Sequence, residues 1–303
     1  MMEMTLFQQK MSALLPNIEI RLNESMAKHT SFQIGGPAEM MAFPKNNKEL
    51  AEILKQSALL DCKTAILGAG TNILAPDQGM DGLVICLKDC MDGMQRLDDN
   101  RIRVAAGITM TRAAVFAAKQ NLGGMEFTHG IPGTVGGGVY MNAGAYGGEI
   151  KDICESVDVM RPDGTLVTLS AKEMGFSYRH SCLEDEPGIV VSAVFVLTPK
   201  PETEIREQMQ ELLKKRKASQ PLEYPSAGSA FKRPIGGFAA ALIDQAGLKG
   251  FQVGGAAVSE KHAGFAVNLG GATAQDVVNL LQQVSEIVYD QFGIRLEPEV
   301  RIW

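Results

Sequence analysis

The glycine-rich stretch of residues 123–148, GGMEFTHGIPGTVGGGVYMNAGAYGG, most constrains what this chain can fold into. It holds ten of the chain's 32 glycines, one acidic residue (Glu126) and neither lysine nor arginine. Glycine permits positive φ angles and lets the main chain approach another group closely. Successive main-chain N–H groups can hold an anion without cationic side chains, so the stretch suggests a diphosphate site. A run of tight turns in a β-rich domain explains the same residues equally well.

Composition sets wide limits on the fold and on the partners. The 303 residues are 45% hydrophobic and 21% charged, which fits one very large globular domain or two to three ordinary ones. The net charge of −6 argues weakly against a nucleic-acid partner. The five cysteines form no CxxC, so neither a disulfide framework nor a metal site is expected. Residues 1–20 do not resemble a signal peptide, and no apolar run approaches the ~20 residues that span a bilayer. We therefore expect a cytoplasmic protein without membrane insertion.

A second glycine motif follows a short apolar strand at residues 64–67. The motif Gly68-Ala-Gly-Thr-Asn72 lacks the third glycine of a dinucleotide fingerprint, and Ala75-Pro76-Asp77 prevents a helix from starting there. The motif predicts a turn that approaches phosphate outside a Rossmann fold, with a plain β-turn as the alternative.

The remaining pattern mixes helices and strands without regular βαβ alternation, which predicts an α+β fold. Helices are expected to begin at Asn46–Asn47, Thr109 and Thr273, the last ending at Gly293, with others after Pro201 and at 238–245. Strands are expected at 82–87, 101–105, 156–160, 165–168, 189–197 and 265–268. The Pro162-Asp-Gly164 sequence predicts a hairpin, and Pro199 is a candidate domain boundary.

Three isolated polar residues are candidates for chemistry, and each has an ordinary alternative. Arg179 follows Tyr178 in a predicted turn, where a surface arginine is the plain interpretation. Ser229 lies among small residues, where a serine that bonds to its own turn is common. Glu299 is predicted in a final strand, on one face with Glu297 and Arg301, where an ion pair is the plain interpretation. GxSxG is absent, which argues against an α/β-hydrolase.

Taken together, seven motifs in order resemble the UDP-N-acetylenolpyruvoylglucosamine reductase family over nearly the whole chain. They are Thr30-Ser-Phe-Gln-Ile-Gly-Gly36, Leu67-Gly-Ala-Gly-Thr-Asn-Ile-Leu74, Gly130-Ile-Pro-Gly-Thr-Val-Gly-Gly137, Asn142-Ala-Gly-Ala-Tyr-Gly147, Tyr178-Arg179, Ala227-Gly-Ser-Ala-Phe-Lys-Arg-Pro234 and Leu296-Glu-Pro-Glu-Val-Arg301.

The resemblance implies an architecture and an activity. A two-lobed FAD-binding module of the vanillyl-alcohol-oxidase type would span residues 1–199, with lobes at about 1–90 and 91–199. An α+β substrate-binding domain would span 200–303. The implied oxidoreductase is a flavoprotein with non-covalent FAD and NADPH as reductant. It reduces the enolpyruvyl group of UDP-N-acetylglucosamine enolpyruvate to the lactyl ether of UDP-N-acetylmuramate. This nucleotide-sugar reaction belongs to peptidoglycan precursor synthesis and so to cell wall biogenesis, cell shape and cell division.

The resemblance also implies roles for individual residues. The catalytic residues would be Arg179, Ser229 and Glu299. Those that bind the cofactor would be Gly68, Ala69, Gly70, Thr71, Asn72, Gly130, Ile131, Pro132, Gly133, Thr134, Val135, Gly136, Gly137, Asn142 and Ala143. Those that bind the substrate would be Tyr178, Lys232, Arg233 and His262. No metal is implied.

The chain departs from part of the family. The short link between Leu197 and Gln220 leaves no room for the tyrosine-bearing loop of some members, so the chain resembles the shorter type. The other type has Asn where this chain has Arg233 and Gln where it has His262, so nucleotide contacts at these positions are in question.

The implied chemistry explains the three catalytic residue types. Hydride addition to the carbon β to the substrate carboxylate places negative charge on the α-carbon and the carboxylate, which positioned donors stabilise. The guanidinium of Arg179 is permanently charged, and two of its N–H groups can bind both oxygens of a carboxylate. A protonated Glu299 can donate a hydrogen bond, and Ser229 can protonate the α-carbon if it lies within reach.

Two alternatives use the same glycine stretch. One is an FAD-dependent oxidase of the same cofactor fold, which would not need both Ser229 and Glu299. The other is a non-catalytic flavin-binding module.

Overall fold

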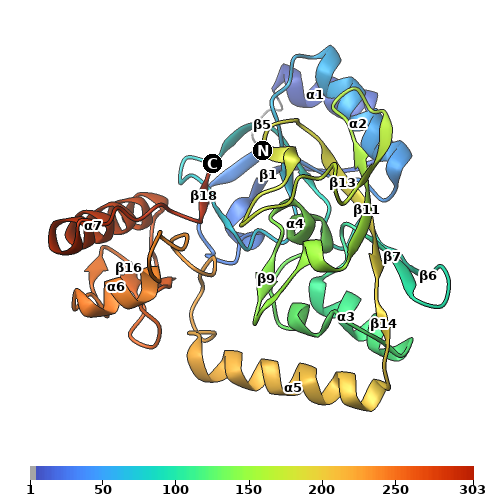
Figure 1. Cartoon of the computed structure of the whole chain (residues 1–303). Helices are drawn as coiled ribbons and strands as arrows, with labels where there is room; N and C mark the ends of the chain where they lie inside the picture. Colours follow the sequence, from blue (N-terminus) through green and yellow to red (C-terminus); the bar gives the residue numbers. More distant parts are fainter. Residues whose placement is uncertain (1–4) are drawn as a thin grey trace. The chain divides into compact units, whose positions relative to one another are not determined.

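The computed structural model describes residues 5–303, which divide into two compact units (Figure 1). The first unit comprises the chain up to Leu22 together with Glu39–Ala69 and Asp81–Lys214. The second unit comprises Asn23–Ala38, Gly70–Met80 and Lys215–Trp303. Two short N-terminal segments therefore fold with the C-terminal part, whereas the predicted division at Pro199 is contiguous. The functional division at Pro199 stays a prediction, and residues 1–4 of its first module lie outside the described residues.

A four-stranded sheet, most of whose residues belong to the first unit, has the strand order β1-β2-β5-β3. The strands are β1 (Glu19–Ser25), β2 (Pro37–Phe43), β3 (Thr64–Leu67) and β5 (Met80–Cys86). The helices α1 (Leu6–Leu14) and α2 (Asn47–Leu59) contribute Met11, Leu50 and Ile53 to the core beside this sheet. The Asn46 side chain accepts a hydrogen bond from the Glu49 N–H, which confirms the predicted helix start.

A five-stranded antiparallel sheet with the strand order β12-β11-β13-β7-β6 forms the other half of the first unit. Its strands are β6 (Met94–Arg96), β7 (Arg101–Ala105), β11 (Cys154–Met160), β12 (Leu166–Ser170) and β13 (Ile189–Val196). Met160 lies opposite Leu166 across the Pro162-Asp-Gly164 turn, so the predicted hairpin is confirmed. Two strand pairs are shorter, β8 (Leu122–Gly123) with β14 (Thr198–Pro199), and β9 (Gly144–Ala145) with β10 (Gly148–Glu149).

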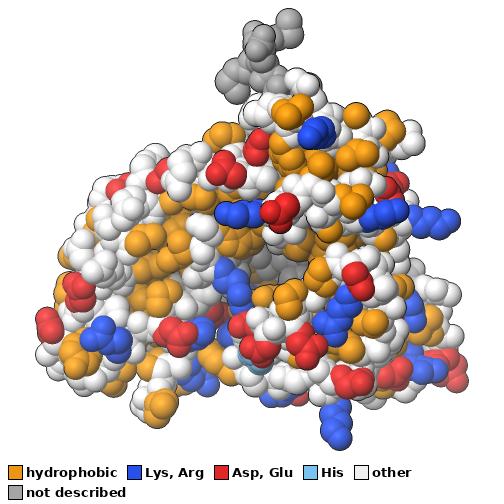
Figure 2. Space-filling view, turned by 90° about the horizontal axis from the view of Figure 1, so that it is seen from above, with side chains coloured by type: hydrophobic (Ala, Val, Ile, Leu, Met, Phe, Trp, Pro, Cys, Tyr) orange, Lys and Arg blue, Asp and Glu red, His pale blue; other side chains and the backbone are white. Residues whose placement is uncertain are grey.

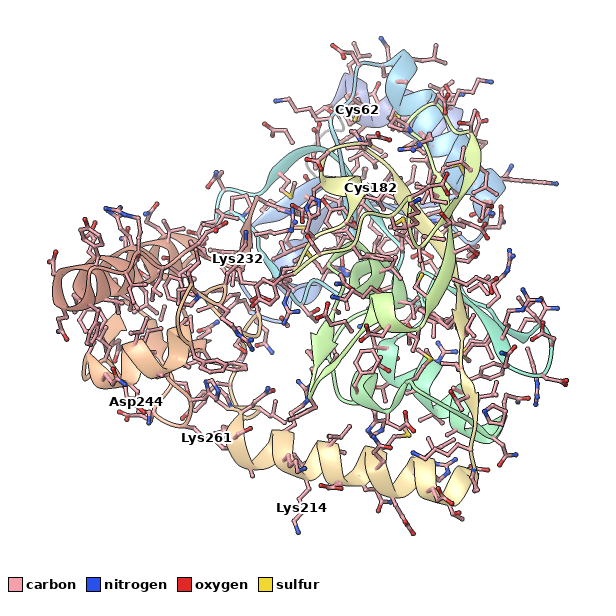
Figure 3. All side chains as sticks on the ribbon, in the orientation of Figure 1. Cys62, Cys182, Lys214, Lys232, Asp244 and Lys261 are labelled. Atoms are coloured by element: carbon pink, nitrogen blue, oxygen red, sulfur yellow. The ribbon has the colours of Figure 1, made fainter. Side chains whose placement is uncertain are left out.

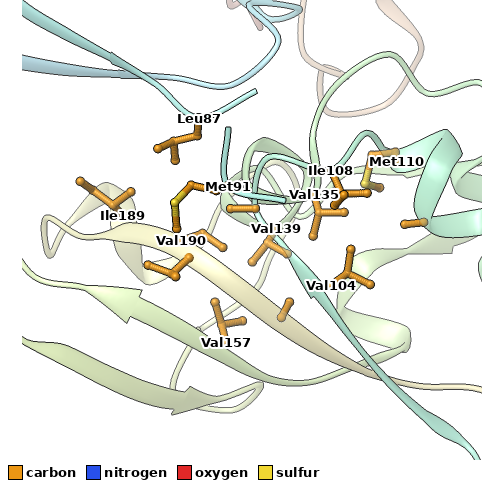
Figure 4. Packing of buried hydrophobic residues seen from close by; sticks show 14 of the residues in the cluster. Leu87, Met91, Val104, Ile108, Met110, Val135, Val139, Val157, Ile189 and Val190 are labelled. Carbon is orange, nitrogen blue, oxygen red and sulfur yellow. The ribbon is translucent and has the colours of Figure 1, made fainter. Parts of the chain in front are cut away.

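The glycine stretch contains a short helix, α4 (Val135–Tyr140), which the sequence analysis did not predict. Val135 and Val139 of α4 are fully buried, and Figure 4 shows them with Val104 of β7 and Val190 of β13 in one apolar cluster. The predicted helix after Thr109 is present as α3 (Met110–Lys119), capped by the Thr109 hydroxyl. The core therefore fixes the glycine stretch from its apolar side.

The second unit has its own core. A three-stranded sheet of β15 (Gln252–Val253), β16 (Ala256–Val258) and β17 (Ala266–Asn268) packs with α6 (Ala239–Gln245) and α7 (Ala274–Phe292) (Figure 1). Thr273 caps α7 and Gly293 ends it with a φ of 68°, as predicted. Asp77, from an N-terminal segment, also accepts hydrogen bonds from the N–H groups of Ala274 and Gln275. The parallel pair of β4 (Ile73–Leu74) and β18 (Arg301–Ile302) joins the same segment to the C-terminus.

The helix predicted after Pro201 is present as α5 (Glu202–Ser219), with Ile205 and Met209 buried. Its residues up to Lys214 belong to the first unit and the rest to the second. The 3-10 helices are η1 (Met26–Lys28), η2 (Glu126–Thr128), η3 (Ile150–Asp152) and η4 (Cys182–Glu184).

Candidate active site

Within the first unit, the start of the predicted diphosphate loop 68–72 lies directly against the predicted loop 130–137. A Cβ atom placed on Gly68, at the end of β3, would lie 2.6 Å from Thr134 Oγ1 in the glycine stretch. Only glycine allows this approach at residue 68 without displacing Thr134. The folded first unit thus brings the Gly68-Ala69 turn to the start of α4.

This junction presents main-chain donors. Within residues 5–303, the N–H groups of Gly68, Ala69, Gly133 and Thr134 donate no hydrogen bond. Thr134 is only 1% exposed, and a buried N–H requires a partner. Gly130 and Gly133 have φ angles of 88° and 136°, which turn the chain before α4. A cradle of donors without cationic side chains suits a diphosphate, so the residues present fit FAD.

The three consecutive glycines of α4 have different surroundings. A Cβ on Gly136 would lie 2.9 Å from Ala106 Cβ, and one on Gly138 would lie 2.8 Å from Met110 Sδ. Gly136 and Gly138 are therefore needed for packing within the protein. Gly137 is exposed, and a Cβ there would meet only Thr134 Oγ1, at 3.7 Å. Gly137 is the helix glycine whose open face is available to a ligand.

Other residues predicted to bind the cofactor are held by the protein in several ways. Val135 is a core residue, while Ile131 and Ala143 are half-buried against the same core. Pro132 is exposed. Gly70, Thr71 and Asn72 belong to the second unit, where a Cβ on Gly70 would lie 2.1 Å from the His29 carbonyl oxygen. The Asn142 side chain is fully buried, and its two N–H bonds go to Glu149 and Ser177. Contacts of these residues with the cofactor stay predictions.

Arg179 lies in a two-residue turn of the first unit. Ser177 and His180 exchange main-chain hydrogen bonds of 3.1 and 3.3 Å around Tyr178 and Arg179. Arg179 has a φ of 56°, in the left-handed region that turns of this kind normally fill with Gly or Asn. Its guanidinium lies 5.0 Å from the centre of the Tyr178 ring, and Nη2 donates to the Gly144 carbonyl at 3.5 Å. The predicted turn is confirmed, and its conformation costs roughly 1–3 kcal/mol.

Ser229 and Glu299 are brought together within the second unit. The Glu299 N–H donates to the carbonyl of Ala230, the residue after Ser229, at 2.9 Å. Asn72 Nδ2 donates to the Glu299 carbonyl at 3.2 Å, so one predicted cofactor residue joins the same network. Glu299 precedes the final strand β18, whereas the sequence analysis placed it inside a strand. Glu297 pairs with Lys232.

The surroundings of Ser229 are open. Ser229 is exposed, and in the described part of the chain its hydroxyl makes no hydrogen bond. The preceding Gly228 has a φ of 79°, and apart from its chain neighbours no atom of residues 5–303 lies within 4 Å of a Cβ placed on it. The hydroxyl is therefore not used to stabilise its own turn.

The predicted substrate-binding residues occupy two places. Tyr178 is 46% exposed beside Arg179 in the first unit. Lys232, labelled in Figure 3, pairs with Glu297 in the second unit, and the Arg233 guanidinium lies 4.6 Å from the centre of the Phe238 ring. His262 accepts a hydrogen bond from the Gly264 N–H at 3.1 Å and meets Phe265 edge-on at 5.0 Å. Burial lowers the pKa of His262, and Lys249 lowers it further against the effect of a main-chain hydrogen bond.

Ser181 is a buried group that the sequence analysis missed. It is fully buried, and its hydroxyl donates to the Tyr140 carbonyl at 2.7 Å. Its position two residues after Arg179 in the sequence gives no sign of this contact with the end of α4.

The thiols have no obvious part in the chemistry. All five cysteines are free, and Cys62 and Cys182 are labelled in Figure 3. Burial raises the pKa of Cys86 to about 11 and that of Cys154 to about 12, which keeps both protonated. Among residues 5–303, no group of three His, Cys, Asp or Glu side chains is arranged to bind a metal.

The surface charge and the helix lengths bear on nucleic-acid and membrane partners. On the face shown in Figure 2, basic and acidic side chains are interspersed. None of the helices in the described part of the chain combines the length and the apolarity needed to cross a bilayer.

Comparison with known proteins first defines the class. The family profile described as "FAD binding domain" matches residues 38–170. A solved alkyldihydroxyacetonephosphate synthase has a similar fold, with a TM-score of 0.50 and 16% identity over 66% of this chain and 42% of that chain. The chain is thus an FAD-binding protein, and the predicted α+β fold with a flavin-binding module is confirmed.

More specific matches define the family. The profile "UDP-N-acetylenolpyruvoylglucosamine reductase, C-terminal domain" matches residues 220–303. The reductase of Agathobacter rectalis is 45% identical over 98% of both chains. The solved reductase from Thermus caldophilus has a TM-score of 0.79 and 36% identity over 95% of this chain and 99% of that chain. This chain belongs to the UDP-N-acetylenolpyruvoylglucosamine reductase family, as the motifs indicated.

Gly137 gives a test of the diphosphate site. Gly137→Val places a branched side chain on the open face of α4, where we expect it to exclude FAD while the core stays folded. The purified variant should lose most of its flavin absorbance and keep its circular dichroism spectrum. Ala105→Val, on the neighbouring strand β7, serves as the control and should keep its flavin. A folded Gly137→Val variant with stoichiometric FAD would contradict the assignment.

His262 gives a test by pH. Because its folded-state pKa lies below the unfolded value of 6.5, the unfolded chain binds more protons as the pH falls through this window. The stability that neutral His262 provides is complete above pH 6.5 and is lost as the pH falls toward the folded pKa. Between pH 7.5 and 5.5, the Tm of the parent should fall more than that of His262→Gln. Equal pH dependence in the two proteins would show that His262 is not buried as described.

Proposed function

We propose that this chain reduces the enolpyruvyl group of UDP-N-acetylglucosamine enolpyruvate to the lactyl ether of UDP-N-acetylmuramate. It would use non-covalent FAD and NADPH in a cytoplasmic step of peptidoglycan precursor synthesis. The 45% identity to a curated reductase over 98% of both chains carries this proposal. The matches at residues 38–170 and 220–303 support an FAD-binding module followed by a substrate-binding domain.

The first unit would hold the cofactor through its main chain. The N–H groups of Gly68, Ala69, Gly133 and Thr134 would bind the diphosphate, and the open face of Gly137 would leave room for it. FAD, when bound, supplies hydride to the carbon β to the substrate carboxylate.

Arg179 would bind the substrate carboxylate. Charge that develops on the α-carbon spreads into this carboxylate, and a fixed guanidinium stabilises the charge as it grows. The left-handed turn and the Tyr178 ring limit the orientations that the guanidinium can take. A positioned group of this kind is worth more in catalysis than a mobile lysine ammonium.

Ser229 would donate the proton to the α-carbon. Its exposed hydroxyl makes no hydrogen bond within residues 5–303, and the adjacent Gly228 leaves space for a ligand. Glu299 is tied to Ala230 through its main chain, so its carboxyl group belongs to the same part of the second unit. In the protonated form it would donate a hydrogen bond to the developing charge. Tyr178, Lys232, Arg233 and His262 would contact the rest of the nucleotide sugar.

Arg179→Lys distinguishes the two half-reactions, which are reduction of the flavin by NADPH and its reoxidation by the substrate. The variant keeps the positive charge but loses the paired N–H donors of the guanidinium. Reoxidation of the NADPH-reduced enzyme by the substrate should therefore slow by roughly 10²-fold. Anaerobic reduction by NADPH should suffer much less. Arg103→Lys, a partly exposed arginine paired with Asp158 in the same unit, is the control. Equal losses in both half-reactions would contradict a role specific to the substrate.

Ser229→Ala tests the proton donor. Loss of a general acid lowers the rate by roughly 10²–10⁴-fold, whereas loss of one structural hydrogen bond costs only about 1 kcal/mol of stability. We expect single-turnover reoxidation by the substrate to fall in this range, reduction by NADPH to survive, and Ser229→Cys to recover part of the rate. Ser226→Ala, three residues earlier, is the matched control. If Ser229→Ala reoxidises within about threefold of the parent, under 1 kcal/mol of barrier, the serine is not the acid.

A further inference from the structure

We propose that Asn142 is a positioning residue for Arg179, and that its side-chain amide holds the turn in which Arg179 lies. The consequence for turnover rests on the role of Arg179 in the proposed function, whereas the structural part can be tested alone. The proposal concerns only the first unit, in which both residues lie.

The Asn142 amide reaches the first residue of the turn. Asn142 is fully buried beyond the end of α4, and its Nδ2 donates to the Ser177 carbonyl at 2.9 Å. Ser177 is also the residue that exchanges main-chain hydrogen bonds with His180 around Tyr178 and Arg179. The amide therefore fixes the carbonyl from which the turn begins.

Two partners of opposite kind fix the direction of this amide. Nδ2 donates its other hydrogen to Glu149 Oε2 at 2.7 Å, and Oδ1 accepts from the Lys151 N–H at 2.9 Å. A carboxylate only accepts and a main-chain N–H only donates, so a reversed amide would lose both bonds. Lys151 Nζ in turn pairs with Glu149 Oε2 at 3.1 Å. Both hydrogens of the Asn142 amide are used within the protein, which leaves none for a cofactor.

The residues that follow the turn are hydrogen-bonded to the C-terminal end of α4. The buried Ser181 hydroxyl donates to the Tyr140 carbonyl, two residues before Asn142. Arg179 Nη2 lies 3.5 Å from the carbonyl of Gly144, two residues after it. Segments before and after Arg179 are thus bound to residues 140–144.

The turn needs this support because Arg179 is strained. A left-handed φ is unfavourable for a residue with a Cβ and persists only where the surroundings enforce it. Without the Asn142 donor, the Ser177 carbonyl keeps only the 3.3 Å bond from the His180 N–H within the turn, and the turn can relax toward ordinary φ angles. The guanidinium would then no longer be presented in one orientation.

Limited trypsin digestion tests the positioning without any substrate. Trypsin cleaves after arginine, and cleavage requires the turn to open locally. In the FAD-loaded protein, we expect Asn142→Ala to raise the rate of cleavage between Arg179 and His180 by on the order of 10-fold. Cleavage after Lys215 in α5 is the internal reference. Ser192→Ala, which removes a hydrogen bond to Asp158 in the five-stranded sheet, is the matched control and should match the parent.

A double variant distinguishes the bond from the Asn142 amide to Ser177 from its bond to Glu149. Asn142→Asp alone would place two carboxylates side by side, and the added Glu149→Gln removes that repulsion. The double variant still lacks the side-chain donor to the Ser177 carbonyl. Cleavage at Arg179 should stay raised in this double variant. Parental cleavage there, or in Asn142→Ala, would overturn the proposal.

The half-reactions test the consequence for turnover. A misplaced guanidinium should slow reoxidation by the substrate by on the order of 10²-fold per bound flavin, and should slow reduction by NADPH much less. In an Arg179→Ala background, Asn142→Ala should change reoxidation by less than about twofold, because the group that it positions is already absent. Equal losses in the two backgrounds would overturn the proposal. If the substrate fails to reoxidise even the parent, the proposed function is wrong and the trypsin result alone decides the role of Asn142.

Discussion

The close approach of the main chain at Gly68 to Thr134 is the contact on which the first unit's site depends. It joins the turn after β3 to the start of α4, and two further glycines seat α4 itself against Ala106 and Met110. A side chain at Gly68 or Gly136 would separate these segments, and the donors at 68–69 and 133–134 would no longer face one ligand. The glycines thus have two uses. Gly68, Gly136 and Gly138 allow close packing within the protein, whereas Gly137 leaves space on the exposed face of α4 for a ligand.

Local sequence signals predicted the regular elements well. Asn46, Thr109 and Thr273 cap helices, Gly293 ends α7, and the Pro162-Asp-Gly164 turn joins β11 to β12. These signals depend on nearby residues, so the sequence carries them. The helix α4 was missed because three of its six residues are glycine, which disfavours a helix by ~1 kcal/mol each. The Thr134 cap and the burial of Val135 and Val139 outweigh this propensity, and only the tertiary fold shows them.

The candidate site was predicted through motifs rather than geometry. The motifs led to the prediction that Ser229 and Glu299 act together, but nothing local in the sequence indicates that Glu299 bonds to Ala230. Nor does any local signal show that Asn23–Ala38 and Gly70–Met80 fold with the C-terminal unit. Arg179 adopts a conformation that turn rules assign to glycine or asparagine. Such a violation at a site of proposed chemistry is where local rules are expected to fail, because function there outweighs local stability.

In the proposed reaction, one protein-bound FAD carries electrons from NADPH to an enolpyruvyl nucleotide sugar. An anaerobic titration of the purified protein tests this claim most directly. One equivalent of NADPH should bleach the yellow protein, and one equivalent of UDP-N-acetylglucosamine enolpyruvate should restore the colour with UDP-N-acetylmuramate as the product. A protein that bleaches but regains its colour only with oxygen, or that is never bleached by NADPH, would contradict the proposed reaction.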